Sequence, residues 1–470
     1  MHIRKAEIDD GGIETVRVFL IEKAIEFSAP VIQEKGNIFL KPNKDRIDIY
    51  CHLKDDPNDL EIQGSQIRHI LEKIDAQQVL LVAKTTEHSQ RILNGFMLSG
   101  FKLDSYKTSA KKTPLITLDT TPDDASQTFW EVNANILCRK LVAEPSNDLT
   151  PSKFVEIIKD GVKEHQALQL RILNRNDILQ EKMLALHGVA QGSTQEPFVV
   201  CIEYNNAPKN SRPILLVGKG VTFDAGGISL KTEDDLAQIP MKIDMAGAAA
   251  VYSALLSAAA TNLEINVVGI LGLVENMPSG SAQKPSDIVR TRNGKTVEIL
   301  STDCEGRLVL ADLIDYGVQY YDPREIVDIA TLEIGTMHAL YDVYAGLFSN
   351  SEDLAERLTK SGRDSCEPLW RLPLHKFYNE IIISDIADLQ NRNSTTKFAS
   401  GSTAAHFLEN FVPPGLPWAH IDIAGVTIRS RQVSAVGKGI SGFGARLLSR
   451  YLSLISAVDS PHQPFIDKNT

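Results

Sequence analysis

Apolar runs of strand length alternate with helix-like segments along most of the chain. One strand-like run, RPILLVGKGVTF (212–223), precedes a helical segment of small residues, AGAAAVYSALLSAAA (246–260), and a second apolar run, EINVVGILGLV (264–274). The alternation continues with a strand KTVEIL (295–300), a helix RLVLADLIDYGV (307–318) and a strand EIVDIATL (325–332). Strands that are apolar throughout are typical of a sheet covered on both faces, so the pattern predicts an α/β fold.

The alternation is interrupted in KKTPLITLDTTPDDASQ (111–127), where prolines and small polar residues break the pattern. We predict a domain boundary there, with a small α/β domain over 1–125 and a larger α/β domain over 128–470. A helical segment (129–145) opens the second domain, and Thr150-Pro151 is typical of the start of the next helix.

Composition and charge argue against several classes of protein. Apolar residues make up 43% and charged residues 23% of the chain, as in soluble globular proteins. The formal net charge of -11 opposes binding to nucleic acid or to an anionic membrane surface. No apolar run has the length expected of a signal peptide or a membrane span, so we expect a cytoplasmic protein that binds no membrane.

The five cysteines, at positions 51, 138, 201, 304 and 366, are odd in number and never form a CxxC pair. The sequence therefore predicts neither a disulfide framework nor a thiolate zinc site. We expect core thiols at four positions, while Cys304 differs because acidic residues flank it.

Acidic residues and an arginine gather in STDCEGRL (301–308), directly after an apolar strand. If 303–307 is extended, Asp303, Glu305 and Arg307 share one face. The carboxyl end of a strand in an open sheet is a usual place for ligands. Taken alone, the segment also fits a solvated turn with an incidental ion pair.

A second cluster of charged residues lies in GKGVTFDAGGISLK (218–231), which carries Lys219, Asp224 and Lys231. Its paired glycines let the backbone approach a ligand closely. Asp244 precedes the small-residue helix, where a helix N-terminus favours an anion, although a plain helix cap is the alternative.

Four carboxylates near the end of one sheet would repel one another unless cations compensate them. These carboxylates are Asp224, Asp244, Asp303 and Glu305. Oxygen ligands without a Cys or His cluster favour Mg, Mn, Zn or Co, and bridging carboxylates are what a two-metal site requires.

The blocks VGKGVTFDAGGISLK, MKIDMAGAAAV, STDCEGRLVLAD, DIATL and WAHIDIAG resemble, in order and spacing, the leucyl aminopeptidase family of metallopeptidases. The resemblance implies a macro-like N-terminal α/β domain and a catalytic domain whose mixed central sheet is flanked by helices. It also implies a two-metal aminopeptidase that removes N-terminal residues, leucine-type with a broad apolar preference, through a metal-bridging water. Family members form homohexamers and act on peptides with a free N-terminus.

The same resemblance implies the metal ligands. Asp224, Asp303 and Glu305 would hold one metal, and Lys219, Asp224, Asp244 and Glu305 would hold the second. Zn or Mn are the expected ions, with Mg or Co as alternatives. A lysine ligand must lose its proton, and two adjacent dications would lower its pKa.

Catalysis is assigned by the resemblance to Lys231 and Arg307, which would polarise the substrate carbonyl and stabilise its developing charge. A bicarbonate held by Arg307 would receive the proton of the nucleophilic water. The pocket for the first side chain is assigned to Met241, Thr331, Leu332 and Ala424. From the residues alone, each of these four also fits a core position.

Several positions depart from the family pattern. The usual string NTDAEGRL is replaced here by a segment with Ser301 and Cys304, MAG replaces MGG at 245–247, and TLEIG replaces TLTG at 331–335. We expect these changes to affect the substrate range more than the reaction type.

Two other readings stay open: a catalytically silent member that acts as a scaffold or binds DNA, and a dipeptidase-like preference such as cysteinylglycine. Two further motif-based classes are disfavoured. GKGISG (437–442) fits GxGxxG but lacks a preceding apolar strand, and the chain has no HExxH.

Overall fold

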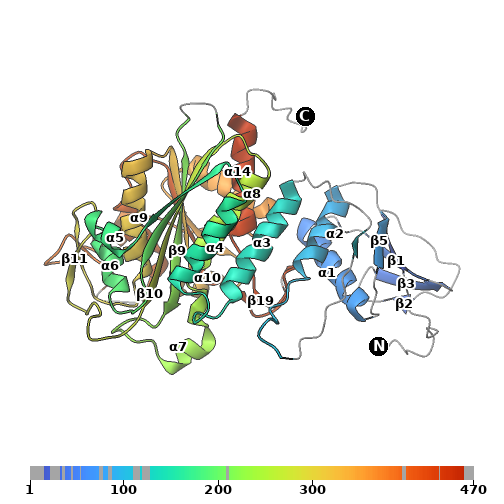
Figure 1. Cartoon of the computed structure of the whole chain (residues 1–470), viewed down its shortest axis with the longest axis horizontal. Helices are drawn as coiled ribbons and strands as arrows, with labels where there is room; N and C mark the ends of the chain where they lie inside the picture. Colours follow the sequence, from blue (N-terminus) through green and yellow to red (C-terminus); the bar gives the residue numbers. More distant parts are fainter. Residues whose placement is uncertain are drawn as a thin grey trace. The chain divides into compact units, whose positions relative to one another are not determined.

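The computed structural model describes residues 15–21, 32–33, 38–43, 46–52, 54, 56–73, 78–82, 87–108, 117–118, 127–207, 211–393, 398–432 and 434–459 (Figure 1). The chain forms two compact units. One consists of Met1–Val132 with Gln432–Gly437, and the other of Asn133–Arg431 with Lys438–Thr470. Most of the predicted boundary at 111–127 lies outside the described residues, so its position stays a prediction.

The first unit contains a six-stranded sheet in the order β2-β3-β4-β1-β5-β6. β4, β1, β5 and β6 run parallel, while β3 is antiparallel to both its neighbours. The strands are β1 (Thr15–Ile21), β2 (Ile32–Gln33), β3 (Ile38–Asn43), β4 (Arg46–His52), β5 (Gln78–Val82) and β6 (Thr117–Leu118). Its helices α1 (Pro57–Lys73) and α2 (Glu87–Leu98) pack so closely that a Cβ on Gly95 would lie 1.7 Å from the Glu61 carbonyl oxygen. This unit is α/β, as predicted.

The second unit is built on an eight-stranded mixed sheet in the order β15-β14-β17-β13-β9-β10-β8-β7. Its four central strands, β17, β13, β9 and β10, are parallel, and β14 and β8 flank them antiparallel. The strands are β7 (Leu168–Leu173), β8 (Phe198–Asn205), β9 (Ile214–Asp224), β10 (Asn266–Asn276), β13 (Glu325–Ala330), β14 (Ala345–Ser349), β15 (Leu369–Arg371) and β17 (Trp418–Asp422). The predicted mixed sheet is confirmed.

Helices cover both faces of this sheet, so β9 and β13 are buried along almost their whole length (Figure 1). One apolar core contains residues of α3 (Gln127–Ala143), α4 (Pro151–Lys163), α8 (Ala246–Ala260), α11 (Glu352–Asp364) and α14 (Ala445–Asp459). The core of the other face contains residues of α5 (Arg175–Gln180), α6 (Leu184–Ala190), α9 (Gly306–Tyr321) and α13 (Ser400–Glu409). Short elements connect these layers: α7 (Glu233–Gln238), η2 (Met241–Ile243), α10 (Ile334–Leu340), α12 (Lys376–Glu380), β18 (Ile428–Arg429) and β19 (Gly439–Ile440).

Helix α8 lies at the centre of one face and has almost no exposed side. Together with η2 it forms a helical stretch, Met241–Ala260, that is long and apolar enough by composition to span a membrane. We expected no such stretch. This stretch is rich in alanine and carries only two charged residues, Lys242 and Asp244, so a core helix has the length and hydropathy of a membrane span; 89% of its most apolar part is buried inside the fold.

The segment STDCEGRL differs from the prediction in two ways. The strand before it, β12 (Thr296–Glu298), belongs to a small sheet with β11 (Ile288–Arg290) and β16 (Leu389–Gln390), and not to the central sheet. The stretch 303–307 is also not extended, because α9 begins there and the Glu305 carbonyl already accepts from Leu308 N at 2.9 Å. Arg307 therefore lies in the first turn of a helix.

The cysteines are free thiols, as predicted. Cys51, Cys138 and Cys201 are buried core residues. Cys366 is a partial exception, because it is only half-buried and has a φ of 57° in the turn after α11.

Candidate metal centre

The predicted charged residues converge at the carboxyl end of the central strand β9. Lys219 and Asp224 lie on β9 itself, and Lys231 lies in the loop that follows it. Asp244 ends η2 just before α8, and Asp303 and Glu305 lie in the turn that leads into α9. Three stretches separated in sequence thus meet at one end of the sheet.

Two lysines hold the four carboxylates in a network of ion pairs. The Lys219 Nζ lies 2.7 Å from both Asp244 Oδ1 and Glu305 Oε1, and Lys231 Nζ lies 2.8 Å from Asp224 Oδ2 and also contacts Asp303. Lys219 is 3% exposed, whereas the Asp303 side chain is 35% exposed and forms the open side of the cluster.

Three of the carboxylates already have the spacing of a metal-binding group. Asp224, Asp303 and Glu305 each offer one oxygen atom, and these atoms lie within 4.8 Å of one another. The second carboxylate oxygen of Asp244 is buried and has no hydrogen-bond partner among the described residues. A buried carboxylate oxygen without a partner is costly, and a cation would satisfy it.

The electrostatics of the cluster also favour added cations. Burial, followed by repulsion from Asp224, raises the pKa of Asp303 to about 7. Burial likewise acts to raise the pKa of Glu305, but attraction to Lys219 and Lys231 outweighs it and lowers that pKa to about 2. Four carboxylates against two ammonium groups leave a formal charge of 2 - 4 = -2. Divalent cations fit this excess of buried negative charge.

Lys219 is a protonated partner of the carboxylates in this ion-pair network. Burial alone would lower the pKa of Lys219, but attraction to Asp244 and Glu305 raises it above its usual range. Its ammonium also donates to the Thr331 carbonyl oxygen at 2.8 Å. Ligation of a metal by this nitrogen would therefore require the lysine to lose its proton as the cation enters.

A glycine loop after β9 shapes one wall of the cluster. Gly226 and Gly227 have φ values of 86° and 66°, which favour glycine. Thr302 fastens this loop, because its hydroxyl donates to the Gly226 carbonyl at 2.6 Å and accepts from Ser229 N at 2.8 Å. Asn276, at the end of β10, donates to Asp224 Oδ1 at 2.8 Å.

Sequence reasoning missed Asn276 and Thr302 as supports of the cluster. Thr302 stands inside the motif STDCEGRL, between residues whose chemistry is more conspicuous. Asn276 could have been noticed as a polar residue at the end of the mainly apolar strand β10.

The predicted pocket residues lie on two loops and on the short helix η2. Thr331 and Leu332 follow β13, Met241 begins η2, and Ala424 follows β17. The Thr331 hydroxyl donates to Asp244 Oδ1 at 2.6 Å, so this residue lies at the charged cluster. Met241 lies one turn before Asp244, whose N–H donates to the Met241 carbonyl at 3.4 Å.

Buried Asp422 joins two of these loops. Its Oδ1 accepts from Leu332 N at 3.2 Å and from Ala424 N at 3.1 Å. Sequence reasoning missed this residue, although it stands in the block WAHIDIAG. The structure thus places Leu332 and Ala424 on a shared anchor.

Arg307 has a different partner from the one expected. It is 2% exposed, and its guanidinium contacts the carboxylate of Glu333, which precedes α10. Glu333 was noticed only as part of the string TLEIG. His420 is buried, with its Nδ1 2.5 Å from Asp328 Oδ1.

Ser301 and Cys304 stand beside the carboxylates, as their position in the motif indicated. The Ser301 hydroxyl accepts from Asp303 N at 3.3 Å. Burial raises the pKa of Cys304 to about 11, although Arg307 acts to lower it. The Cys304 thiol is therefore protonated at neutral pH.

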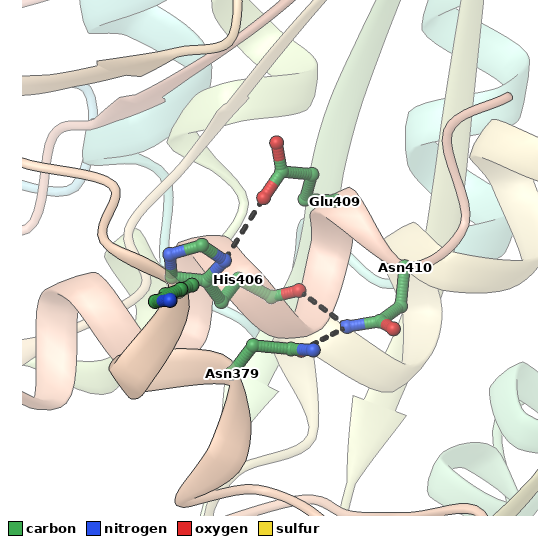
Figure 2. A pocket seen from close by; sticks show the side chains of 5 residues that line it. Asn379, His406, Glu409 and Asn410 are labelled. Carbon is green, nitrogen blue, oxygen red and sulfur yellow. Dashed lines mark hydrogen bonds and ion pairs between the residues drawn. The ribbon is translucent and has the colours of Figure 1, made fainter. Parts of the chain in front are cut away.

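A pocket lies away from these residues, at α12 and α13 (Figure 2). Its volume is about 240 Å³, and it is lined by Lys376, Asn379, His406, Glu409 and Asn410. The His406 Nδ1 lies 2.9 Å from Glu409 Oε2, and the Asn410 amide donates to Asn379 Oδ1 at 2.7 Å. Its lining side chains thus bond largely to one another.

The fold and the cluster define an α/β protein with a buried centre of carboxylates and lysines suited to divalent cations. The sequence model described as the cytosol aminopeptidase family, catalytic domain, matches residues 136–449. The chain belongs to the cytosol aminopeptidase family, which confirms the predicted leucyl aminopeptidase family.

Two curated relatives show the extent of the likeness. The chain is 45% identical over 314 residues to a probable cytosol aminopeptidase of Rickettsia bellii (strain RML369-C), and 45% identical over 315 residues to that of Rickettsia africae (strain ESF-5). Each match covers 67% of this chain and spans 62% of the relative's length.

A solved structure extends the likeness to nearly the whole chain. The bottromycin maturation enzyme BotP in complex with Mn superposes with a TM-score of 0.84 at 28% identity. The superposition covers 95% of this chain and 100% of that one.

Proposed function

We propose that this chain is a two-metal aminopeptidase that hydrolyses the N-terminal residue, of leucine type, from peptides with a free N-terminus. The observation that carries the proposal is the set of oxygen atoms from Asp224, Asp303 and Glu305 within 4.8 Å of one another, next to the buried Lys219. Family membership supports it, as does the complex of the similar enzyme BotP with Mn.

The residues fit two divalent cations, Zn or Mn being our first choice. Asp224, Asp303 and Glu305 would hold one, and Lys219, Asp224, Asp244 and Glu305 the other. Bound dications polarise a carbonyl and lower the pKa of water near them. Asp224 and Glu305 belong to both proposed ligand sets.

If Asp224 and Asp303 hold cations, Lys231 would no longer be needed as their partner. Its ammonium, now 2.8 Å from Asp224 Oδ2, would then donate to the substrate carbonyl and stabilise its developing negative charge. The unpartnered oxygen of Asp244 would accept from the α-ammonium of the substrate. This contact would select peptides with a free N-terminus.

Side-chain selection is assigned to the loops that carry Met241, Thr331, Leu332 and Ala424. Apolar Met241 and Leu332 favour an apolar first residue. We also propose, from the family, a cytoplasmic homohexamer.

The test compares metal content and hydrolysis of an N-terminal leucine chromophore for the native chain, Glu305→Ala and Glu156→Ala. Glu156 is a matched control because it is an exposed carboxylate on α4. We expect Glu305→Ala to lose both metals and activity, since it removes the proposed shared ligand, while Glu156→Ala keeps both.

Peptides with a free amine are compared with their N-acetylated forms. Equal cleavage of blocked peptides would contradict the role of Asp244, and a metal-loaded chain that cleaves no peptide would favour a silent scaffold. Cleavage confined to dipeptides such as cysteinylglycine would narrow the substrate class.

A further inference from the structure

The guanidinium of Arg307 is neutralised by a carboxylate of the chain itself. Arg307 lies in the first turn of α9 and Glu333 directly before α10, and their side chains form an ion pair. The Arg307 side chain is 3% exposed and that of Glu333 12% exposed. A buried guanidinium needs such an anion, because an unpaired buried charge is strongly unfavourable.

Both members of this ion pair are tied to the proposed metal centre by the backbone. Arg307 follows Glu305 by two residues. Glu333 follows Thr331 by two residues, and Thr331 accepts from Lys219 at 2.8 Å and donates to Asp244 at 2.6 Å. Glu333 therefore lies on the same loop as Thr331, and its carboxylate contacts the arginine that follows Glu305 by two residues.

A free anion would compete with Glu333 for the same guanidinium. Bicarbonate at Arg307 would bring a further negative charge next to Glu333 and near Glu305, and like charges at short distance repel. The intrinsic carboxylate is covalently tethered, so its effective concentration at Arg307 exceeds that of a dilute solute.

We propose that the Glu333 carboxylate takes the place of bicarbonate at Arg307 and acts as the general base of this chain. This inference rests on the proposed aminopeptidase function. As the water oxygen forms its bond to the carbonyl carbon, one O–H bond breaks and the proton passes to Glu333. As the C–N bond breaks, Glu333 returns the proton to the leaving amine nitrogen, which restores the carboxylate.

The alternative role of the pair is structural, as a tie between α9 and the loop before α10. The two roles differ in what an added anion does. A structural tie that is lost is not replaced by a small solute, whereas a missing base held by Arg307 is replaced by bicarbonate or formate.

The experiment uses the full, metal-loaded chain in buffer freed of carbon dioxide. Leucine-peptide hydrolysis is measured with and without bicarbonate or formate for the native chain, Glu333→Gln and Glu352→Gln. Glu352 is the matched control, because it also begins a helix and pairs with an arginine, Arg371, but on the surface. Thermal melting reports whether each variant is folded.

We expect the native chain to be equally active with and without bicarbonate. Glu333→Gln should lose about 10²-fold in rate without added anion, the scale of general-base catalysis, and recover with bicarbonate or formate. Glu352→Gln should behave like the native chain.

Binding of ¹³C-labelled bicarbonate, followed by NMR, gives a readout that does not need turnover. Glu333→Gln should bind the label, and the native chain and the double variant Glu333→Gln/Arg307→Met should not. Bicarbonate-dependent activity of the native chain, or a folded Glu333→Gln that neither binds nor responds to anions, would overturn the proposal.

If Glu333→Gln does not fold, the same measurements on the native chain and on Glu333→Asp test whether Glu333 takes the place of bicarbonate. A native chain with metals but no hydrolysis of any free-amine peptide would refute the aminopeptidase function instead. In that case the labelled bicarbonate still tells whether Glu333 occupies Arg307.

Discussion

Gly247 lies in the first turn of α8, close to Asp244, and packs directly against the central sheet. A Cβ added at Gly247 would lie 2.1 Å from the Ile329 carbonyl oxygen on β13 and 3.1 Å from Lys219 N on β9. Both neighbours are backbone atoms of central strands, so neither can rotate away. Gly247→Ala must therefore move the start of α8 by at least about 0.9 Å, from 2.1 Å to the 3.0 Å below which Cβ contacts essentially never occur.

The cost of this substitution follows from two opposing terms. Overpacking a dense core costs about 1–3 kcal/mol, and replacing a helical glycine by alanine returns about 1 kcal/mol. We expect Gly247→Ala to lower the free energy of unfolding by up to about 2 kcal/mol. For a unit of the size of Asn133–Arg431 with Lys438–Thr470, this corresponds to a fall in Tm of up to about 3 °C.

The same displacement should reach the proposed metal centre. Asp244 precedes the first residue of α8 by two positions and pairs with Lys219 at 2.7 Å. A shift of about 1 Å near the chemistry is enough to cost roughly 10²-fold in rate. Metal affinity and leucine-peptide hydrolysis should therefore fall together with Tm.

Calorimetry, metal titration and hydrolysis are compared for Gly247→Ala and Gly280→Ala. Gly280 is the control because the described part of the chain has nothing within 4 Å of a Cβ at that position. If Gly247→Ala is as stable and as active as Gly280→Ala, the close seating of α8 on β13 is refuted.

Two further predictions concern buried polar groups. Thr302→Val removes the hydroxyl that joins Ser229 and Gly226, so we expect a loss of about 1–3 kcal/mol in unfolding free energy and weaker metal binding; unchanged metal titrations would argue against this role. Burial raises the pKa of Glu367 from 4.5 to about 7, so the folded chain holds a proton that the unfolded chain releases between these values. Its contribution is complete below pH 4.5 and is lost as pH rises through about 7, which amounts to about 3 kcal/mol. Glu367→Gln should flatten this part of the pH profile of unfolding, and parallel profiles for both proteins would contradict the shift.

The sequence predicted best those elements that consist of apolar or small residues along their whole length, because such elements are buried on all sides. The apolar run 212–223 became β9, the small-residue segment 246–260 became α8, and 264–274 became β10 with a shift of two residues. The run 295–300 mixes polar with apolar residues, and its strand has only three residues, of which only Val297 is buried. The sequence pattern did not distinguish a strand of the central sheet from the middle strand of a small sheet.

The wrong expectation for 303–307 has a local cause. Asp303, Glu305 and Arg307 alternate with other residues, and alternation predicts a strand only where no helix begins. Hydrogen bonds from Leu308 and Val309 to the Glu305 carbonyl start α9 at this point. The helix keeps Glu305 in the cluster and turns Arg307 toward Glu333.

The charged cluster could be predicted because its chemistry is concentrated in short motifs, whereas its supports could not. Asn276 lies 52 residues from Asp224, and Glu333 lies 26 residues from Arg307. Such pairs depend on which strands are neighbours in the sheet, and no spacing along the chain encodes that.

The sequence therefore reveals some functional departures from the family pattern more readily than others. The proposed ligands Asp303 and Glu305 lie within one short motif, so the departures at Ser301 and Cys304 were visible at once, and Ser301 indeed contacts the Asp303 backbone. The change to TLEIG was equally visible but carried no meaning until Glu333 was found on Arg307. The effect of the Glu333 carboxylate depends on the charged group that it contacts, and only the fold shows that this group is Arg307.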